Sequence, residues 1–233
     1  MDILCARWPE KTREEHFASV LCGEVYAAGE RVREPLRRIA ENAPISFAAK
    51  AFVSRGGGKL DFALEFFGIQ AAGKTVLDAG ASTGGFAHCL LLKGAAAVHA
   101  VDVGRGQFHA SLRSDPRVIL KEKTNIMSLE ALVPRPDFAV CDLSFRSLRG
   151  AARHILDLTT EGRLIALVKP QFEWENPPAD FDGVVKSDSA LRDILERLGE
   201  DLKTEGVFVA ASAESPLRGQ TGNREFFFDM RSS

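Results

Sequence analysis

The feature that most constrains the fold is an alternation of strand-sized and helix-sized segments from residue 57 onward. A helix is expected over residues 58–67, and short apolar runs then recur between helical stretches. Such alternation builds βαβ units, in which helices cover both faces of a parallel sheet. We therefore expect an α/β fold with a doubly wound, mostly parallel sheet. The expected strands are Thr75–Ala79, Ala97–Val101, Val118–Leu120, Phe138–Cys141 and Leu164–Val168.

The C-terminal part adds an amphipathic helix and two more strands. The strands, Val207–Ala211 and Glu225–Met230, are expected to pair as an antiparallel hairpin. The three phenylalanines from 226 to 228 fit a buried strand better than a platform for stacking bases. Gly206 closes the helix, whose apolar face is formed by Leu191, Ile194, Leu195, Leu198 and Leu202.

The first 47 residues read as a small α+β unit. Thr12 and Glu15 have the spacing of a capping box, which starts a helix, and Gly23 is suited to end it. A turn at Ala28–Gly29 predicts a short hairpin, and Ile45–Phe47 a further strand.

Composition excludes several classes of protein. The four cysteines form no CxxC motif and the five histidines have no metal-ligand spacing, so we expect no metal, no disulfide framework and a cytoplasmic location. No signal peptide and no apolar run of membrane length is visible, so no membrane partner is expected. The net charge is −2, but residues 1–59 carry 10 basic and 8 acidic side chains, a weak sign of RNA binding.

Every predicted parallel strand is followed by polar or glycine-rich residues. Ligands of open α/β sheets bind beyond the carboxyl ends of the strands, so this edge is the candidate site. The residues at the five strand ends are Asp78 to Gly85, Asp102, Glu122 with Asn125, Asp142, and Lys169.

The glycine loop has the pattern GxxxGG rather than the GxGxxG of nicotinamide enzymes. Gly80 permits a tight turn, and Gly84 and Gly85 let backbone approach a ligand at a helix N-terminus. Asp102, 24 positions after Asp78, can hold the two hydroxyls of a ribose. The alternative is that the loop and the aspartate only connect elements.

Seven ordered segments carry a resemblance to a known family. The chain resembles the TlyA family of rRNA 2′-O-methyltransferases, within the FtsJ-type group, and its N-terminal unit resembles an S-four-type RNA-binding module. The segments are VSRGGGKL (53–60), LDAGASTGGF (77–86), AVDVGRGQ (100–107), LRSDPRV (112–118), CDLSF (141–145), LVKPQFE (167–173) and GNREF (222–226).

The resemblance implies a Rossmann-like class I methyltransferase fold over residues 55–233 and a small RNA-binding module over residues 1–50. Because the chain opens at Met1-Asp2-Ile3, where that module has an Arg-Leu-Asp run, we expect its first element to be truncated. The implied cofactor is S-adenosylmethionine. The implied cofactor-binding residues are Asp78, Gly80, Ser82, Thr83, Gly84, Gly85, Phe86, Asp102, Val103, Glu122, Asn125 and Asp142.

The resemblance also implies a catalytic tetrad of Lys59, Asp142, Lys169 and Glu225, acting on a ribose 2′-hydroxyl of ribosomal RNA, at cytidine, free or in ribosomal subunits. A ribose hydroxyl needs a base aligned with the methyl group, and an unprotonated Lys169 can serve. A second ammonium at Lys59 favours that state, whereas the two carboxylates oppose it.

The sequence departs from the family at a few places, and other functions stay open. Met127 and Ser187 stand where the family often has Arg and Asp, and Ala190 lies near the place of a usual histidine. The alternatives are a non-catalytic RNA- or ribosome-binding protein, a pore-forming hemolysin, since relatives carry that name, and a nicotinamide enzyme. Lysis has little support without a spanning segment or a strongly basic amphipathic helix.

Overall fold

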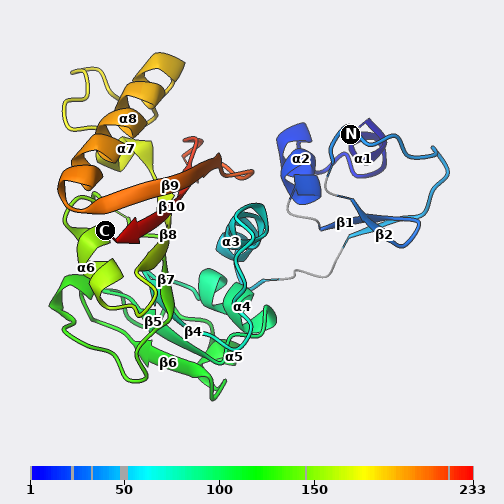
Figure 1. The fold of residues 1–233 in the computed structure, drawn as a ribbon. Coiled ribbons are helices and arrows are strands. Elements are labelled where there is room, and N and C mark those ends of the chain that lie inside the picture. Colours follow the sequence, from blue (N-terminus) through cyan, green and yellow to red (C-terminus); the bar gives the residue numbers. More distant parts are fainter. Residues whose placement is uncertain are drawn as a thin grey trace.

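A computed structural model describes residues 2–21, 24–32, 34–47, 52–144, 146–219 and 221–232. In the larger part of the protein, drawn from cyan to red in Figure 1, helices and strands alternate along the sequence. The elements are α3 (Arg55–Phe66), β4 (Thr75–Ala79), α4 (Gly85–Leu92), β5 (Ala97–Val101), α5 (Ala110–Arg113), β6 (Val118–Lys121), the 3-10 helix η1 (Ile126–Ser128), β7 (Phe138–Cys141), α6 (Ala151–Asp157), β8 (Arg163–Val168), α7 (Pro170–Glu173), α8 (Asp188–Thr204), β9 (Val207–Glu214) and β10 (Phe226–Ser232).

Seven strands form one sheet in the order β6-β5-β4-β7-β8-β10-β9. The first five strands are parallel, and β10 runs antiparallel between β8 and β9. The predicted α/β fold with a mostly parallel sheet is confirmed, as is the C-terminal antiparallel pair. Phe227 is completely buried in β10, which confirms that the three phenylalanines belong to a core strand.

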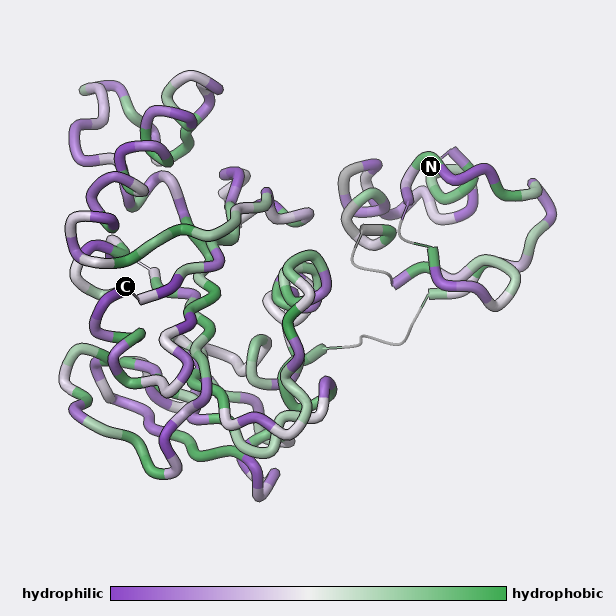
Figure 2. The backbone as a smooth tube through the Cα atoms, viewed as in Figure 1, coloured by the Kyte–Doolittle hydropathy of each residue, from purple (hydrophilic) through white to green (hydrophobic). Residues whose placement is uncertain are grey.

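The sheet has an apolar core on each face. Alternate residues of one strand face opposite sides, so Val76 lies in the core beneath α3 and α4, whereas Leu77 lies in the core beneath α6 and α8. Strands buried on both faces are apolar along most of their length, and the middle of the sheet is mostly green in Figure 2. Helix α8 is mostly hydrophilic there, because only its inner face, with Leu198 and Leu202, is buried.

The N-terminal unit contains helices α1 (Asp2–Arg7) and α2 (Arg13–Leu21) and the strands β1 (Val25–Ala27), β2 (Glu30–Val32) and β3 (Ile45–Phe47), in the sheet order β2-β1-β3. The predicted capping box is present, because the backbone NH of Thr12 donates to Glu15 Oε2 at 2.8 Å and the NH of Glu15 donates to Thr12 Oγ1 at 3.2 Å. Helix α1 was not predicted, and Gly23 lies outside the described residues. The division of the chain near residues 50–55 stays a prediction.

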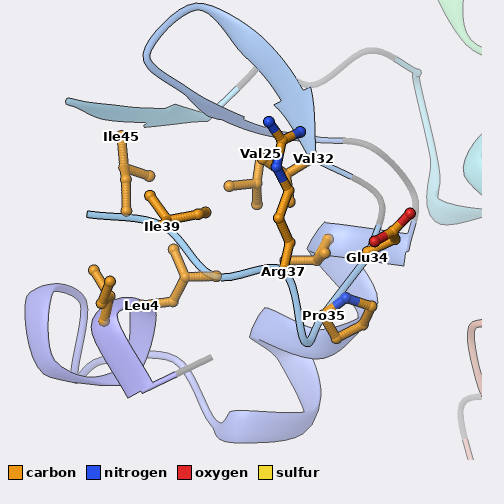
Figure 3. A pocket seen from close by; sticks show the side chains of 10 residues that line it. Leu4, Val25, Val32, Glu34, Pro35, Arg37, Ile39 and Ile45 are labelled. Carbon is orange, nitrogen blue, oxygen red and sulfur yellow. The ribbon is translucent and has the colours of Figure 1, made fainter. Parts of the chain in front are cut away.

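A small cavity lies inside this unit, between its helices and its sheet (Figure 3). Apolar side chains such as Leu4, Val25 and Ile45 line it, and its volume is about 30 Å³. That is roughly the volume of one water molecule in the liquid, so the cavity is a packing gap rather than a ligand site. Within the described ranges, no helix has both the length and the apolar character that crossing a membrane demands.

Replacing Phe227 by alanine should remove the most deeply buried phenylalanine of β10 from the core. We expect the Phe227→Ala variant to lose about 3–5 kcal/mol in the free energy of unfolding, from lost transfer energy and the remaining cavity. Phe208→Ala is the matched control, because Phe208 on the neighbouring strand is 43% exposed and should cost about 1 kcal/mol or less. Urea unfolding followed by fluorescence measures both, and equal losses would contradict this account of the core.

Candidate active site

The alternation along the strands brings the predicted site residues to one face of the sheet. Val76, Val140 and Leu167 belong to the core cluster beneath α3 and α4. Two residues further along each strand come Asp78, still inside β4, and Asp142 and Lys169, just after β7 and β8, so all three lie on that same face. The carboxyl ends of β4, β7 and β8 thus place two carboxylates and one amine at one edge.

Lys169 is held by the loop that follows β7. Its Nζ atom lies 2.6 Å from Asp142 Oδ1 and donates a hydrogen bond to Ser144 Oγ at 2.9 Å. The Lys169 side chain is only 12% exposed, so little of its amine is left to bulk water. Asp142 and Lys169 were each predicted to follow a strand at this edge, and the structure brings them into contact.

Lys59 and Glu225 form a second ion pair at the same edge. Lys59 lies in α3 and its Nζ is 2.5 Å from Glu225 Oε2, with the two side chains 11% and 3% exposed. Since Phe226 pairs with Val168, Glu225 stands one register position further, beside Lys169. Two Lys–carboxylate pairs therefore sit at the end of β8, each with balanced charge.

The carboxylate of Glu225 depends on the backbone around it. A Cβ atom added to Gly219 would lie 2.7 Å from Glu225 Oε1, so only glycine leaves room for that oxygen. The buried Asn223 fixes the same loop, because its Oδ1 accepts from the NH of Val185 at 2.9 Å and its Nδ2 donates to the carbonyl of Gly183 at 2.8 Å. Glu225 is thus held by its surroundings as well as by Lys59.

The glycine loop after β4 is tight because two of its glycines adopt positive φ. Gly80 has φ +85°, and a Cβ there would come within 2.5 Å of the Asp142 carbonyl oxygen, so the loops after β4 and β7 touch. Gly84 has φ +91° and caps the N-terminus of α4. Between these glycines, Ser82 and Thr83 are exposed.

Asp102 lies beside this loop at the end of β5. Its Oδ2 accepts from the backbone NH of Ser82 at 2.8 Å, and its Oδ1 accepts from that of Gly104 at 2.6 Å. The next side chain, Val103, is 70% exposed. An apolar side chain left in water beside a carboxylate is a suitable surface for a ligand with a flat apolar part and hydroxyl groups.

Three other predicted cofactor residues take part in packing and capping. Glu122 accepts from the NH of Gly106 at 2.7 Å and pairs with Arg113, whose guanidinium holds the pKa of Glu122 below its usual range. Asn125 caps η1 through the NH of Met127. Phe86 is buried in the core, where its ring centroid lies 6.3 Å from that of Phe227.

Asp78 has the most unusual environment of the predicted residues. Its side chain is fully buried, and among the described residues no side chain pairs with either oxygen, while the backbone NH of Ala87 acts weakly to lower its pKa. Burial raises the pKa of Asp78 to about 8, and the negative charges of Asp142 and Asp102 add to the effect. A buried carboxylate without a partner is costly and is expected at functional sites.

In three of the motifs, one functional residue was predicted from the sequence and a second one nearby was missed. Ser144 in CDLSF, Glu173 in LVKPQFE and Asn223 in GNREF make contacts that hold the tetrad residues or their loops. The motifs were the available signal, because each of these residues stands within four positions of a predicted one. Trp174, which follows α7, packs on Phe181 with ring centroids 5.1 Å apart.

The comparisons with known proteins agree with this geometry. The family model for FtsJ-like methyltransferases matches residues 52–231. The 16S/23S rRNA (cytidine-2′-O)-methyltransferase TlyA of Mycobacterium tuberculosis is 38% identical over 98% of this chain and 87% of its own. Hemolysin A of Brachyspira hyodysenteriae is 34% identical over 89% of this chain and 88% of its own.

Solved structures give the same picture. A Streptococcus thermophilus protein named as a hemolysin superposes with a TM-score of 0.74 at 33% identity, covering 100% of this chain and 87% of its own. An S-adenosylmethionine-dependent methyltransferase from Mesorhizobium loti, 15% identical, shares the fold with a TM-score of 0.53, over 72% of this chain and 95% of its own. The chain therefore belongs to the FtsJ-like methyltransferase family and, within it, to the group of TlyA relatives that match it over nearly its whole length.

Proposed function

We propose that this protein transfers a methyl group from S-adenosylmethionine to a ribose 2′-hydroxyl of ribosomal RNA, at cytidine. The observation that carries the proposal is the pair of ion pairs, Lys169–Asp142 and Lys59–Glu225, beside the glycine loop. The relative named above as an rRNA (cytidine-2′-O)-methyltransferase supplies the substrate class. A ribosomal substrate also implies that the protein works in the cytoplasm.

The residues around the glycine loop fit S-adenosylmethionine. The carboxyl of Asp78 is buried without a side-chain partner, and a cation beside it would favour its charged form. The cofactor carries such a cation, the ammonium group of its amino acid part. Asp102 and the exposed Val103 offer a hydrogen-bond acceptor and an apolar surface, which suit a nucleoside. Gly80, with its tight turn, lets the backbone approach the ligand.

The proposed chemistry places the acceptor hydroxyl at Lys169. When bound, S-adenosylmethionine supplies an electrophilic methyl group on a sulfonium. The 2′-oxygen forms a bond to that methyl carbon as the carbon–sulfur bond breaks and sulfur keeps the electron pair. For this step the ammonium of the Lys169–Asp142 ion pair first gives a proton to water, and its Nζ then takes the hydroxyl proton, while Asp142 and Ser144 fix the direction of the amine. Alignment of oxygen, carbon and sulfur supplies a large part of the rate.

The second ion pair has a supporting part in this proposal. Lys59 and Glu225 are buried together, so their charges are less screened than charges in water. We propose that Lys59 faces the ribose or its phosphate while Glu225 holds it in place. The N-terminal unit over residues 1–50 is the proposed RNA-binding module, and residues 55–233 the catalytic domain.

Replacing Lys169 by alanine tests the proposal directly. We expect wild-type protein to transfer labelled methyl groups from S-adenosylmethionine to rRNA or ribosomal subunits that lack the modification. Lys169→Ala should lose about 100- to 10,000-fold in rate, because the proton acceptor is gone, while its cofactor affinity is retained. Lys203→Ala, an exposed lysine of α8, is the control and should keep full activity.

Three other outcomes would each point to a different conclusion. Full activity of Lys169→Ala would remove this lysine from the mechanism. Cofactor binding by the wild type without any transfer to rRNA or subunits would favour a non-catalytic RNA- or ribosome-binding protein. Leakage of liposomes on addition of the protein would favour lysis, the activity implied by the hemolysin names among relatives.

Gly219→Ala should displace the Glu225 carboxylate without changing any charge. The added methyl group would stand 2.7 Å from Glu225 Oε1, so we expect roughly a tenfold or greater loss in kcat through misplacement. Gly199→Ala in α8 is the matched control, since nothing lies within 4 Å of its added Cβ, and it should stabilise the helix by about 0.5–1 kcal/mol. Steady-state kinetics and thermal unfolding measure the pair. Unchanged kcat in Gly219→Ala would show that the position of Glu225 is unimportant.

Asp78 should make the stability of the ligand-free protein depend on pH. Its pKa is about 8 in the folded state and about 3.9 unfolded. The folded state thus binds the proton more tightly, so this contribution is complete below the unfolded pKa and is lost as pH rises to 8. The loss approaches about 1.4 kcal/mol per pH unit between the two values.

Asp78→Asn should therefore flatten the fall in unfolding free energy between pH 6 and pH 8, as followed by urea unfolding at several pH values. Asp115→Asn is the control, because hydrogen bonds from Arg117 lower the pKa of Asp115 and keep it ionised across that range. A wild-type slope in Asp78→Asn would contradict the burial of a protonated Asp78.

A further inference from the structure

Glu173, outside the predicted tetrad, is a buried carboxylate with three donors from one loop. The Ser147 hydroxyl donates to its Oε2 at 2.5 Å, the NH of Leu148 donates to its Oε1 at 2.9 Å, and Arg149 donates to Oε2 at 3.2 Å. The residue is 4% exposed, and burial raises the pKa of Glu173 although these hydrogen bonds oppose the rise. A carboxylate in such a place costs free energy unless it is well paired.

The donors to Glu173 belong to the loop that also holds Lys169. Helix α7 is a single turn with Lys169 at its N-cap and Glu173 as its last residue. Lys169 contacts the start of the loop after β7, at Asp142 and Ser144, and Glu173 contacts its later part. The single turn of α7 therefore contacts the loop after β7 twice, once near its start and once in its later part.

Arg149 anchors the later part of the loop to the rest of the fold. Its guanidinium donates to the Glu173 carbonyl oxygen at 3.2 Å and to Asp201 Oδ2 at 2.8 Å, which connects the loop to α8. Asp201 belongs to α8, the long helix on the face of the sheet opposite α3 and α4. The hydrogen bonds of Arg149 to α8 and to Glu173 therefore resist movement of the loop away from α7.

We propose that Glu173 is a positioning residue, which fixes the loop after β7 so that Asp142 and Ser144 keep the Lys169 amine directed at the acceptor hydroxyl. The proposal rests on the proposed function of Lys169. Glu173 touches no reacting atom itself, and it acts through hydrogen bonds to Ser147, Leu148 and Arg149. An apolar residue of similar size would fill the same space without holding these three donors.

The kinetic test compares Glu173→Gln with Glu175→Gln. Glutamine keeps the shape of Glu173 but replaces one acceptor oxygen by a donor, so at least one loop contact is lost. We expect kcat to fall about 10- to 100-fold by misplacement of the amine, with the KM for S-adenosylmethionine nearly unchanged. Glu175 is 57% exposed and 3.6 Å from Arg149, so its variant should keep wild-type kinetics. Equal kcat in the two variants would overturn the proposal.

A second test does not need RNA and separates this inference from the proposed function. Reductive methylation with formaldehyde and a borane reductant, followed by peptide mass spectrometry, measures how accessible the Lys169 amine is, with the exposed Lys203 as internal reference. We expect Lys169 to react slowly in the wild type and several-fold faster in Glu173→Gln.

Ser147→Ala removes one donor from the opposite side and should also speed the reaction, which keeps the test valid if Glu173→Gln does not fold. Unchanged reactivity of Lys169 in the folded variants would overturn the positioning role. If the wild type methylates no rRNA, the proposed function fails, while the reactivity of Lys169 still decides whether Glu173 positions it.

Discussion

The two-residue period of the β-strand is the constraint on which the site depends. Because side chains alternate, Asp78 near the end of β4, Asp142 after β7 and Lys169 after β8 lie on the face covered by α3 and α4. A shift of one position in any strand would turn its charged residue to the other face. The aspartates at 78 and 142 and the lysine at 169 meet for this reason, and the apolar core beneath them fixes the register.

The antiparallel strand β10 brings Glu225 to the site, at an edge where a parallel strand would end rather than begin. It enters between β8 and β9 from the opposite direction, so its first residues stand at the edge where the parallel strands end. This brings Glu225 beside Lys169 and beneath α3, where it meets Lys59. Buried ion pairs contribute little net stability, so their presence at this edge agrees better with a role in function.

The strands, their order of appearance and the polar strand ends could be predicted, because each is a local pattern of a few residues. The Lys59–Glu225 contact joins residues 166 positions apart, so only the resemblance to a family suggested it. The roles of Glu173 and Ser144 were not predicted, because they depend on the path of the loop after β7 past the single turn of α7. Helix α1 was missed because only Leu4 of its six residues is buried, which leaves a weak apolar pattern.

The most direct test of the central claim is the position of the methyl group on the RNA. Ribosomal subunits would be treated with the protein and trideuteromethyl-labelled S-adenosylmethionine, and the RNA digested to nucleosides for mass spectrometry. The account predicts label in the ribose of cytidine, since a lysine held by a carboxylate and a hydroxyl suits an alcohol acceptor. Label on a nucleobase would contradict it.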